Sequence, residues 1–139
     1  MTSEEQVKEV NRQFYRAFES LDLEVMEKIW VKDSRAQCIH PGWPLMKGWN
    51  EVRESWSRIF SNTQFIKFTL GEVHVTLQGD WALVICLENI LTLSGGGLTE
   101  STVLTTNIFI EEEGVWYLVH HHGSPLFLWG SPEQPQEVQ

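Results

Sequence analysis

The chain has 139 residues, a hydrophobic content of 42% and a formal net charge of −9 at pH 7. This length predicts one domain, and seven Trp and seven Phe give it enough apolar surface for a core, which excludes a disordered chain. No stretch approaches the roughly 20 apolar residues of a membrane span, and residues 1–9 lack the pattern of a signal peptide. We therefore expect a cytoplasmic protein.

The charged residues are distributed unevenly. All ten Lys and Arg residues lie at or before Lys67, together with ten acidic residues, whereas residues 68–139 contain nine acidic residues and no basic ones. Nucleic acids and anionic membranes are bound by basic patches, so we expect neither as a partner. Cys38 and Cys86 each lie in an apolar segment, which favours buried, reduced thiols over a disulfide.

Three helices are predicted in the first half of the chain. Ser3 and Gln6 match a capping box, and apolar residues at helical spacing extend this first helix to Leu21. Asp22 is the expected N-cap of a short second helix. Apolar residues from Trp49 to Phe60 again repeat at helical offsets and predict the third.

The remaining elements are predicted to be strands. A short strand over residues 35–40 ends at Pro41, and residues 73–77 alternate before a turn at residues 79–80. Three further strands are expected over residues 81–93, 98–111 and 115–122. Strands this long must bend, which makes one sheet face concave. The pattern predicts an α+β domain over residues 1–130, with helices on one face of a curved antiparallel sheet, and a frayed tail over residues 131–139.

This order of elements resembles the nuclear transport factor 2-like superfamily, in particular its SnoaL-like and ketosteroid isomerase-related branch. Local resemblances are Asp22-Leu23, Ile39-His40-Pro41, Gly79-Asp80 and residues 116–124. The last of these is also similar to the final strand of the calcium/calmodulin-dependent kinase II association domain. The resemblance covers residues 3–125 and implies a cone-shaped, cystatin-like roll with a cavity; it is poorly specific for activity.

The resemblance also implies which strand residues face the cavity. Inward-facing residues are expected to be Ile85, Leu87, Asn89, Val103, Thr105, Asn107, Phe109, Tyr117, Val119 and His121. Outward-facing residues are expected to be Val84, Cys86, Ile90, Leu104, Ile108, Ile110, Trp116, Leu118, His120 and His122. The outward set is mostly apolar, so we predict that a second copy covers it in a homodimer.

His40 is the leading candidate for chemistry, because it matches the position at which the isomerases hold a general-base carboxylate. An imidazole there could remove a proton next to a carbonyl, although a strand-end histidine satisfied by backbone groups fits the sequence as well. Asn107 matches the protonated aspartic acid that stabilises the oxyanion in those enzymes. Phe14 occupies the matching tyrosine position, and Tyr15 is offset by about 100° around the helix.

A ligand in this cavity is expected to be neutral and largely apolar. The pocket arginines of the kinase association domain match Asn89, Asn107 and Gly123 here, so that charge is lost. Asn89 and Asn107 could bind a ligand or form a structural pair. The other predicted ligand-binding residues are Trp43, Trp56, Phe109, Tyr117 and His121.

No metal or cofactor is expected. His120 and His122 could share an ion, but no third ligand is evident and the chain lacks the Cys/His spacing of structural zinc sites. Phosphate-loop, dinucleotide and nucleophile-elbow motifs are also missing from the sequence. Three hypotheses follow: an isomerase, lyase or hydrolase-type enzyme with His40 as base, a non-catalytic ligand-binding module, or a homodimerisation module with a residual pocket.

Overall fold

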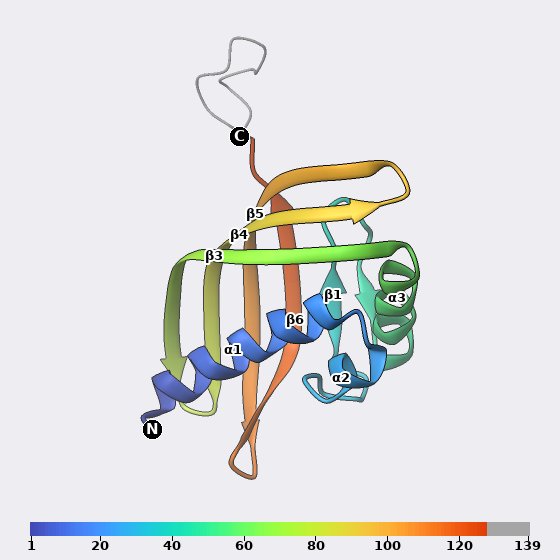
Figure 1. The fold of residues 1–139 in the computed structure, drawn as a ribbon. Helices are drawn as coiled ribbons and strands as arrows, with labels where there is room; N and C mark the ends of the chain where they lie inside the picture. The colour runs from blue at the N-terminus through green and yellow to red at the C-terminus, as the bar shows by residue number, and fades with distance from the viewer. Residues whose placement is uncertain (128–139) are drawn as a thin grey trace.

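The computed structural model describes residues 1–127 of the chain, and the predicted tail over residues 131–139 lies outside them. Figure 1 shows the helices lying against one face of a bent sheet. The helices are α1 (Ser3–Ser20), α2 (Leu23–Glu27) and α3 (Trp49–Ser61). The strands are β1 (Gln37–Ile39), β2 (Met46–Lys47), β3 (Thr63–Gln78), β4 (Trp81–Ser94), β5 (Gly97–Glu112) and β6 (Val115–Pro125).

Helix α1 begins one residue earlier than its sequence predicts. The capping box joins Thr2 and Glu5 rather than Ser3 and Gln6: Thr2 Oγ1 accepts from the Glu5 amide at 3.2 Å, and Glu5 Oε1 accepts from the Thr2 amide at 2.7 Å. Asp22 caps α2 as predicted, with its side chain accepting from the Glu24 amide at 2.9 Å. These caps satisfy amides that the helices themselves leave without partners.

The six strands form one sheet in the order β2-β1-β6-β5-β4-β3. Strands β3 to β6 are an antiparallel meander, whereas β1 pairs in parallel with β6 and carries β2 on its outer edge. The parallel pairing places Cys38 opposite His121. Strand β3 starts ten residues before the predicted strand at Val73, and β2 has no counterpart in the prediction.

Three irregularities interrupt the strand pairing: one lies at the start of β3, between Thr63 and Phe65, and the other two lie within strands and bend the sheet. One lies in β3 between Gly71 and His74, where Glu72 has a φ of 50°. The other lies in β6, where Val119 is an extra residue between the partners of Ile108 and Phe109. A bulge adds twist and a local bend to its strand, so both contribute to the curvature of the sheet.

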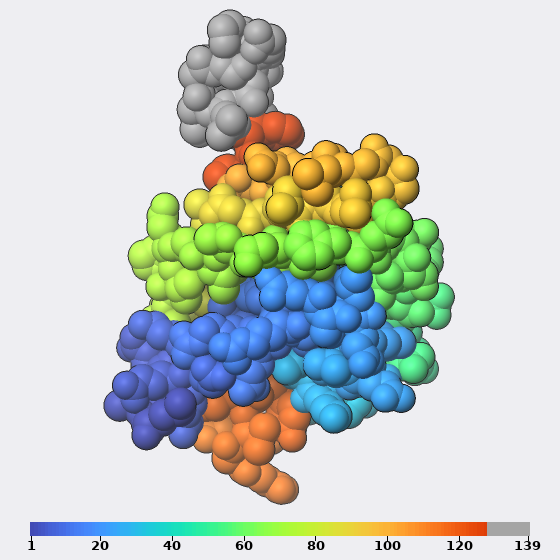
Figure 2. Space-filling model, in the orientation of Figure 1, coloured from blue at the N-terminus to red at the C-terminus, as the bar shows by residue number. Residues whose placement is uncertain are grey.

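The concave inner face carries the core. Helix α1 crosses it and is held by two side-chain hydrogen bonds: Trp116 Nε1 donates to Gln6 Oε1 (3.3 Å), and Asn107 Nδ2 donates to Asn11 Oδ1 (2.9 Å). In Figure 2, α1 and β3 lie side by side over the front of the molecule. Trp30 and Trp56 are fully buried, so aromatic rings fill much of the space between helices and sheet. The predicted fold class is confirmed.

The predicted facing is correct for β5 and wrong for β4. Asn107 lies inside, opposite Val84, and Glu88 lies inside, opposite Val103. The predicted inward residues Ile85, Leu87 and Asn89 therefore face outward, and the predicted outward residues Val84, Cys86 and Ile90 face inward. Residues 82–87 are apolar at every position, so the sequence holds no alternation to show which set is inside.

The facing of β6 changes along the strand because of the bulge at Val119. His121 lies inside and His120 and His122 lie outside, as predicted. On the other side of the bulge the predictions are reversed: Trp116 and Leu118 are buried against the helices, while Tyr117 and Val119 face outward. A one-residue insertion exchanges the two faces of a strand, and nothing in the local sequence marks it.

Candidate functional site

The inner face of the sheet holds a buried cluster of polar side chains, here called the interior cluster: Asn11, Tyr15, Cys86, Glu88, Asn107 and His121. They come from α1, β4, β5 and β6, and the hydrogen-bonded members are at most 3% exposed. Because buried polar groups are costly unless paired, their hydrogen bonds define how the cluster is held.

Asn107 is the centre of the interior cluster. Its Nδ2 donates to Asn11 Oδ1 at 2.9 Å and to Tyr15 Oη at 3.3 Å. Its Oδ1 accepts from His121 Nδ1 at 2.6 Å, because an amide oxygen has no proton to give. His121 therefore carries its proton on Nδ1, and Nε2 is its basic nitrogen.

Tyr15 supplies the hydroxyl that the sequence analysis did not find at Phe14. Both residues are buried: the Phe14 ring lies 5.0 Å from that of His121, while the Tyr15 hydroxyl reaches the sheet. Tyr15 Oη donates to Glu88 Oε2 and lies 3.4 Å from Cys86 Sγ. Helix α1 lies close enough to the sheet to bury two adjacent positions, so the 100° offset did not exclude Tyr15.

Glu88 is the ionisable residue that sequence reasoning missed. Burial raises the pKa of its carboxyl to about 7, although the hydrogen bond from Tyr15 acts in the opposite direction. The available signal was the pair Glu88-Asn89 in an apolar strand, since one of two adjacent polar residues must face inward.

His40 lies at the end of β1 and is 2% exposed. Its Nε2 lies 2.9 Å from Ser55 Oγ, and Ser55 Oγ donates to the Val52 carbonyl at 2.6 Å. The Ser55 proton is thus used, so His40 Nε2–H donates to Ser55 and Nδ1 is the basic nitrogen. Burial lowers the pKa of His40 to about 4, which keeps the ring neutral at pH 7.

The predicted aromatic wall is partly assembled around His40. Its ring lies 4.7 Å from Trp56, 4.9 Å from Trp43 and 6.3 Å from His121. Trp43 is half-buried, with the Arg58 guanidinium 5.2 Å above its ring. Phe109 is fully buried in the same core.

Two predicted site residues lie away from this interior. Asn89 is exposed and donates to the Thr69 carbonyl at 3.2 Å, at a surface hollow of about 550 Å³. Tyr117 lies on the outer face, opposite Ile110. The predicted pairing of Asn89 with Asn107 is therefore wrong, since the two side chains are on opposite faces of the sheet.

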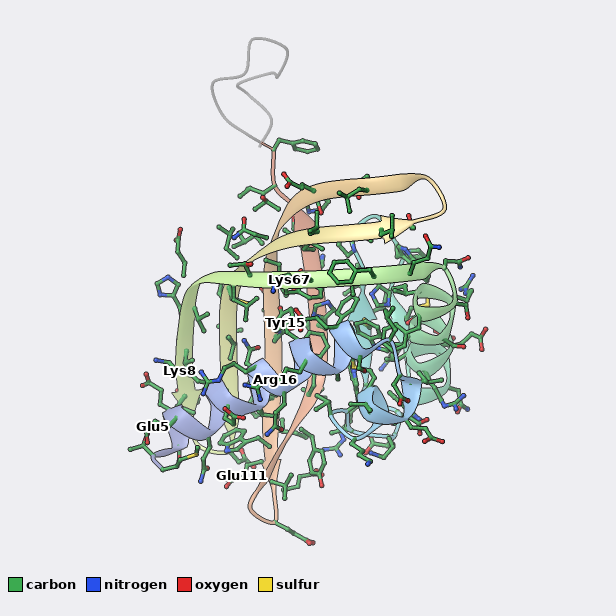
Figure 3. The ribbon with its side chains drawn as sticks, in the orientation of Figure 1. Glu5, Lys8, Tyr15, Arg16, Lys67 and Glu111 are labelled. Carbon is green, nitrogen blue, oxygen red and sulfur yellow. The ribbon has the colours of Figure 1, made fainter. Side chains whose placement is uncertain are left out.

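A cavity of about 340 Å³ opens between α1 and β3. It is lined by Arg12, Tyr15, Arg16, Glu19, Phe68, Leu70 and Val73. Figure 3 shows Tyr15 and Arg16 on α1, next to β3. Tyr15 belongs to both the cavity wall and the interior cluster, so it separates the cluster from solvent.

Residues 1–127 contain no cluster of three or more His, Cys, Asp or Glu side chains arranged to hold a metal ion. No helix in the same part of the chain is long and apolar enough to cross a membrane.

The α+β roll with helices on its concave face is the architecture of nuclear transport factor 2-like proteins. Residues 7–128 match the model of the SnoaL-like domain, and the chain belongs to this family.

Two solved structures are similar at more than the level of fold. A candidate dehydratase of the NTF2-like family from Streptomyces avermitilis is 37% identical, with a TM-score of 0.83 over 89% of this chain and 97% of that one. A candidate calcium/calmodulin-dependent protein kinase type II association domain from Thiobacillus denitrificans is 30% identical, with a TM-score of 0.76 over 85% of this chain and 93% of the other.

A curated relative is the F-box protein SKIP8 of Arabidopsis thaliana, which is 31% identical over 119 residues. The match covers 86% of this chain and 49% of SKIP8, so the chain spans about half the length of that protein.

Proposed function

We propose that this SnoaL-like domain is an association module in which two copies pair through the outer face of the sheet. The observation that carries the proposal is a set of apolar side chains on that face, here called the outer patch. It consists of Trp81, Leu83, Ile85, Leu87, Leu104, Ile108, Ile110, Tyr117 and Val119.

Most side chains of the outer patch are partly or fully exposed in the single chain, and Ile110, which is 8% exposed, is its buried member. Trp81 is 50% exposed and Leu104 is 43% exposed, although both lie on long strands in the middle of the chain. Solvated sheet faces normally carry polar residues, so a continuous apolar face indicates a surface that is covered by a partner.

The shape and charge of the outer patch suit a second copy. A hollow of about 400 Å³ lies where Trp81, Ile108 and Val119 meet the β1 edge, and it can receive side chains of a partner. Strands β4, β5 and β6 contain no Lys or Arg, and the cations at this hollow are those of Arg35 and Lys47 on its β1–β2 side, so the paired strands themselves bring no cations together. A face used by both copies is the geometry of a twofold dimer, and one similar structure is itself an association domain by name.

The oligomeric state tests this proposal. We expect the wild type to sediment as a dimer and Leu104→Arg to sediment as a folded monomer, because the charge, placed beside Leu87 at one end of the outer patch, loses its hydration when the patch is covered. The matched control is Val25→Arg on α2, where a valine of similar exposure (39%) lies on the helical side, and it should remain dimeric. A monomeric wild type, or a dimeric Leu104→Arg, contradicts the proposal.

A second candidate function is small-molecule chemistry of the lyase type in the interior, with His40 as base. The specific observation is the set of buried ionisable and amide groups, since ionisable groups with strongly shifted pKa values cluster at functional sites. The aromatic wall of this interior site would be Trp43, Trp56 and Phe109, and its polar contacts would be Asn107 and His121. Asn89 and Tyr117 lie on the opposite face of the sheet and would take no part. The similarity to a candidate dehydratase suggests removal of water from a small hydroxylated carbonyl compound.

A thermal-shift screen with small carbonyl compounds tests the second candidate. Binding to the folded state raises the melting temperature by mass action. We expect at least one compound to stabilise the wild type and to be turned over, with turnover lost in His40→Asn. Stabilisation without turnover would indicate a binding module, and no stabilisation by any compound would contradict an interior site.

A further inference from the structure

Glu88 has no cationic partner. None of the ion pairs formed by residues 1–127 includes it, and its 3% exposure removes it from water. The group that stabilises it most directly is the Tyr15 hydroxyl, which donates to Oε2. A carboxyl buried without a cation costs free energy that an apolar residue would not, so packing alone does not account for it.

The surroundings of Glu88 are polar on one side and apolar on the other. The titratable groups nearest to it are Tyr15 from α1 and Cys86 from its own strand, and His121 on β6 is connected through Asn107. Strand β3 presents Leu70 opposite Glu88. No Lys or Arg is among these contacts.

Thr105 places a second hydroxyl beside Glu88. It lies opposite Cys86 on β5 and is fully buried, and, like the Tyr15 hydroxyl, it lowers the pKa of the Glu88 carboxyl. Its Oγ1 makes no well-aligned hydrogen bond among the described residues, so it can also contact a bound molecule beside Glu88.

Access to Glu88 leads through the cavity between α1 and β3. The inner wall of that cavity includes Tyr15, which donates to Glu88, and Leu70, which is opposite Glu88 on the neighbouring strand. One ring and one aliphatic side chain thus separate the carboxyl from a solvent-open cavity of about 340 Å³. The rim carries Arg12 and Arg16, both more than half exposed.

We propose that Glu88 is a catalytic proton carrier for a small β-hydroxy carbonyl compound, which enters between α1 and β3 and takes over the hydrogen bond of Tyr15 through its carbonyl oxygen. The inference rests on one part of the second candidate function, the removal of water from a small hydroxylated carbonyl compound, and it replaces His40 by Glu88 as the group that moves the proton.

The proposed reaction needs one carboxyl and is balanced. The Glu88 carboxylate takes the proton from the carbon next to the carbonyl, and the electrons of that C–H bond form the C=C bond. The C–O bond at the neighbouring carbon breaks, and the departing hydroxide takes the same proton back from Glu88 and leaves as water. Glu88 returns to its starting state, and no oxidant or reductant is consumed.

Tyr15 couples substrate binding to the basicity of Glu88. In the free protein its hydroxyl stabilises the carboxylate. When the hydroxyl turns to the substrate carbonyl, it stabilises the charge that develops on that oxygen, and Glu88 loses a donor and becomes a stronger base. A carboxyl whose pKa lies near neutrality is suited to accepting and returning a proton at pH 7.

The test uses the full chain with 3-hydroxybutanoyl-N-acetylcysteamine as probe and follows the vinyl protons of the product by NMR. We expect Glu88→Gln to lower kcat/KM by about 100-fold or more, which is the usual contribution of general acid–base catalysis. Glu100→Gln, the same change at an exposed glutamate of β5, is the matched control and should stay within about threefold of the wild type, as expected for a group outside the proton transfer. Val73→Trp, which fills the cavity, should raise KM.

Several results would overturn this inference. No conversion by the wild type contradicts it, and so does a Glu88→Gln variant that is folded by circular dichroism and retains wild-type rates. If His40→Asn is inactive while Glu88→Gln is active, His40 is the base. That result would support the second candidate function and contradict the role of Glu88. The profile of kcat/KM against pH separates a catalytic from a structural role: loss of the titration near pH 7 in Glu88→Gln supports the catalytic role.

Discussion

Glu88 and His40 are both buried, but burial moves their pKa values in opposite directions. The carboxyl is held protonated up to about pH 7, and the imidazole is held neutral down to about pH 4. Each shift makes the free energy of unfolding depend on pH, because the folded and unfolded states bind different numbers of protons between the folded and the unfolded pKa.

Glu88→Gln should change the pH dependence of stability in a defined direction. The folded state binds the Glu88 proton more tightly than the unfolded state, so the stabilisation is present below pH 4.5 and is lost as the pH rises to 7. The shift corresponds to about 3 kcal/mol across that range. Urea unfolding of the variant at pH 5 and pH 8 should lack this decline, and an unchanged slope would show that Glu88 is solvated.

The acid side of the pH profile should respond to His40. Its folded pKa is lowered, so the unfolded state takes up the proton first and stability is lost as the pH falls from 6.5 towards 4. We expect His40→Asn to flatten this part of the urea-unfolding profile, with His121 responsible for the remaining loss because burial also lowers its pKa. A steeper loss of stability in the variant would contradict this assignment.

At the scale of secondary structure, the residues of the long strands do not show by themselves which face is inside. The facing of β5 was predicted correctly because the resemblance placed Asn107 inside, although residues 103–110 show no polar–apolar alternation. Strand β4 is apolar on both faces, and β6 changes face at Val119. The facing of these strands is therefore decided by pairing and not by local sequence.

The turn between β5 and β6 offers a test at this scale. Glu113 has a φ of 52° and Gly114 a φ of 83°, which is the pair of positive values that a type I′ hairpin turn requires. Asparagine tolerates the left-handed region better than glutamate, so Glu113→Asn should raise stability by about 0.5 kcal/mol. Glu112→Asn, which lies in the strand, is the control and should give no gain in urea unfolding.

At the scale of the whole molecule, the apolar character of both sheet faces has two consequences. One face is covered by the helices and forms the core, and the other is the face that we propose a second copy covers. A domain that depends on such pairing should melt at a higher temperature when it is more concentrated. We expect about 2 °C for each tenfold rise in protein concentration, measured by scanning calorimetry, and no dependence for Leu104→Arg.

The fold could be predicted from the sequence because helical spacing, caps and turns are local. The residue types themselves specify the N-cap at Asp22 and the turns at Gly79-Asp80 and Glu113-Gly114, independently of their neighbours in the fold. Of the candidate site, Asn107 and His121 were placed correctly on the inner side, whereas His40, expected at the rim of a cavity, is buried. Glu88 and Tyr15 were missed, because their roles depend on neighbours about 70 residues away.

The sequence by itself determined the elements, the fold class and the presence of more apolar strand surface than one core can use, because these follow from residue type and spacing. Tertiary structure decided which face of β4 lies inside, where β6 changes face and which hydroxyl meets which carboxyl. Those outcomes depend on strand register and on the position at which α1 packs against the sheet. Both are set by packing between distant segments, and local sequence does not encode them.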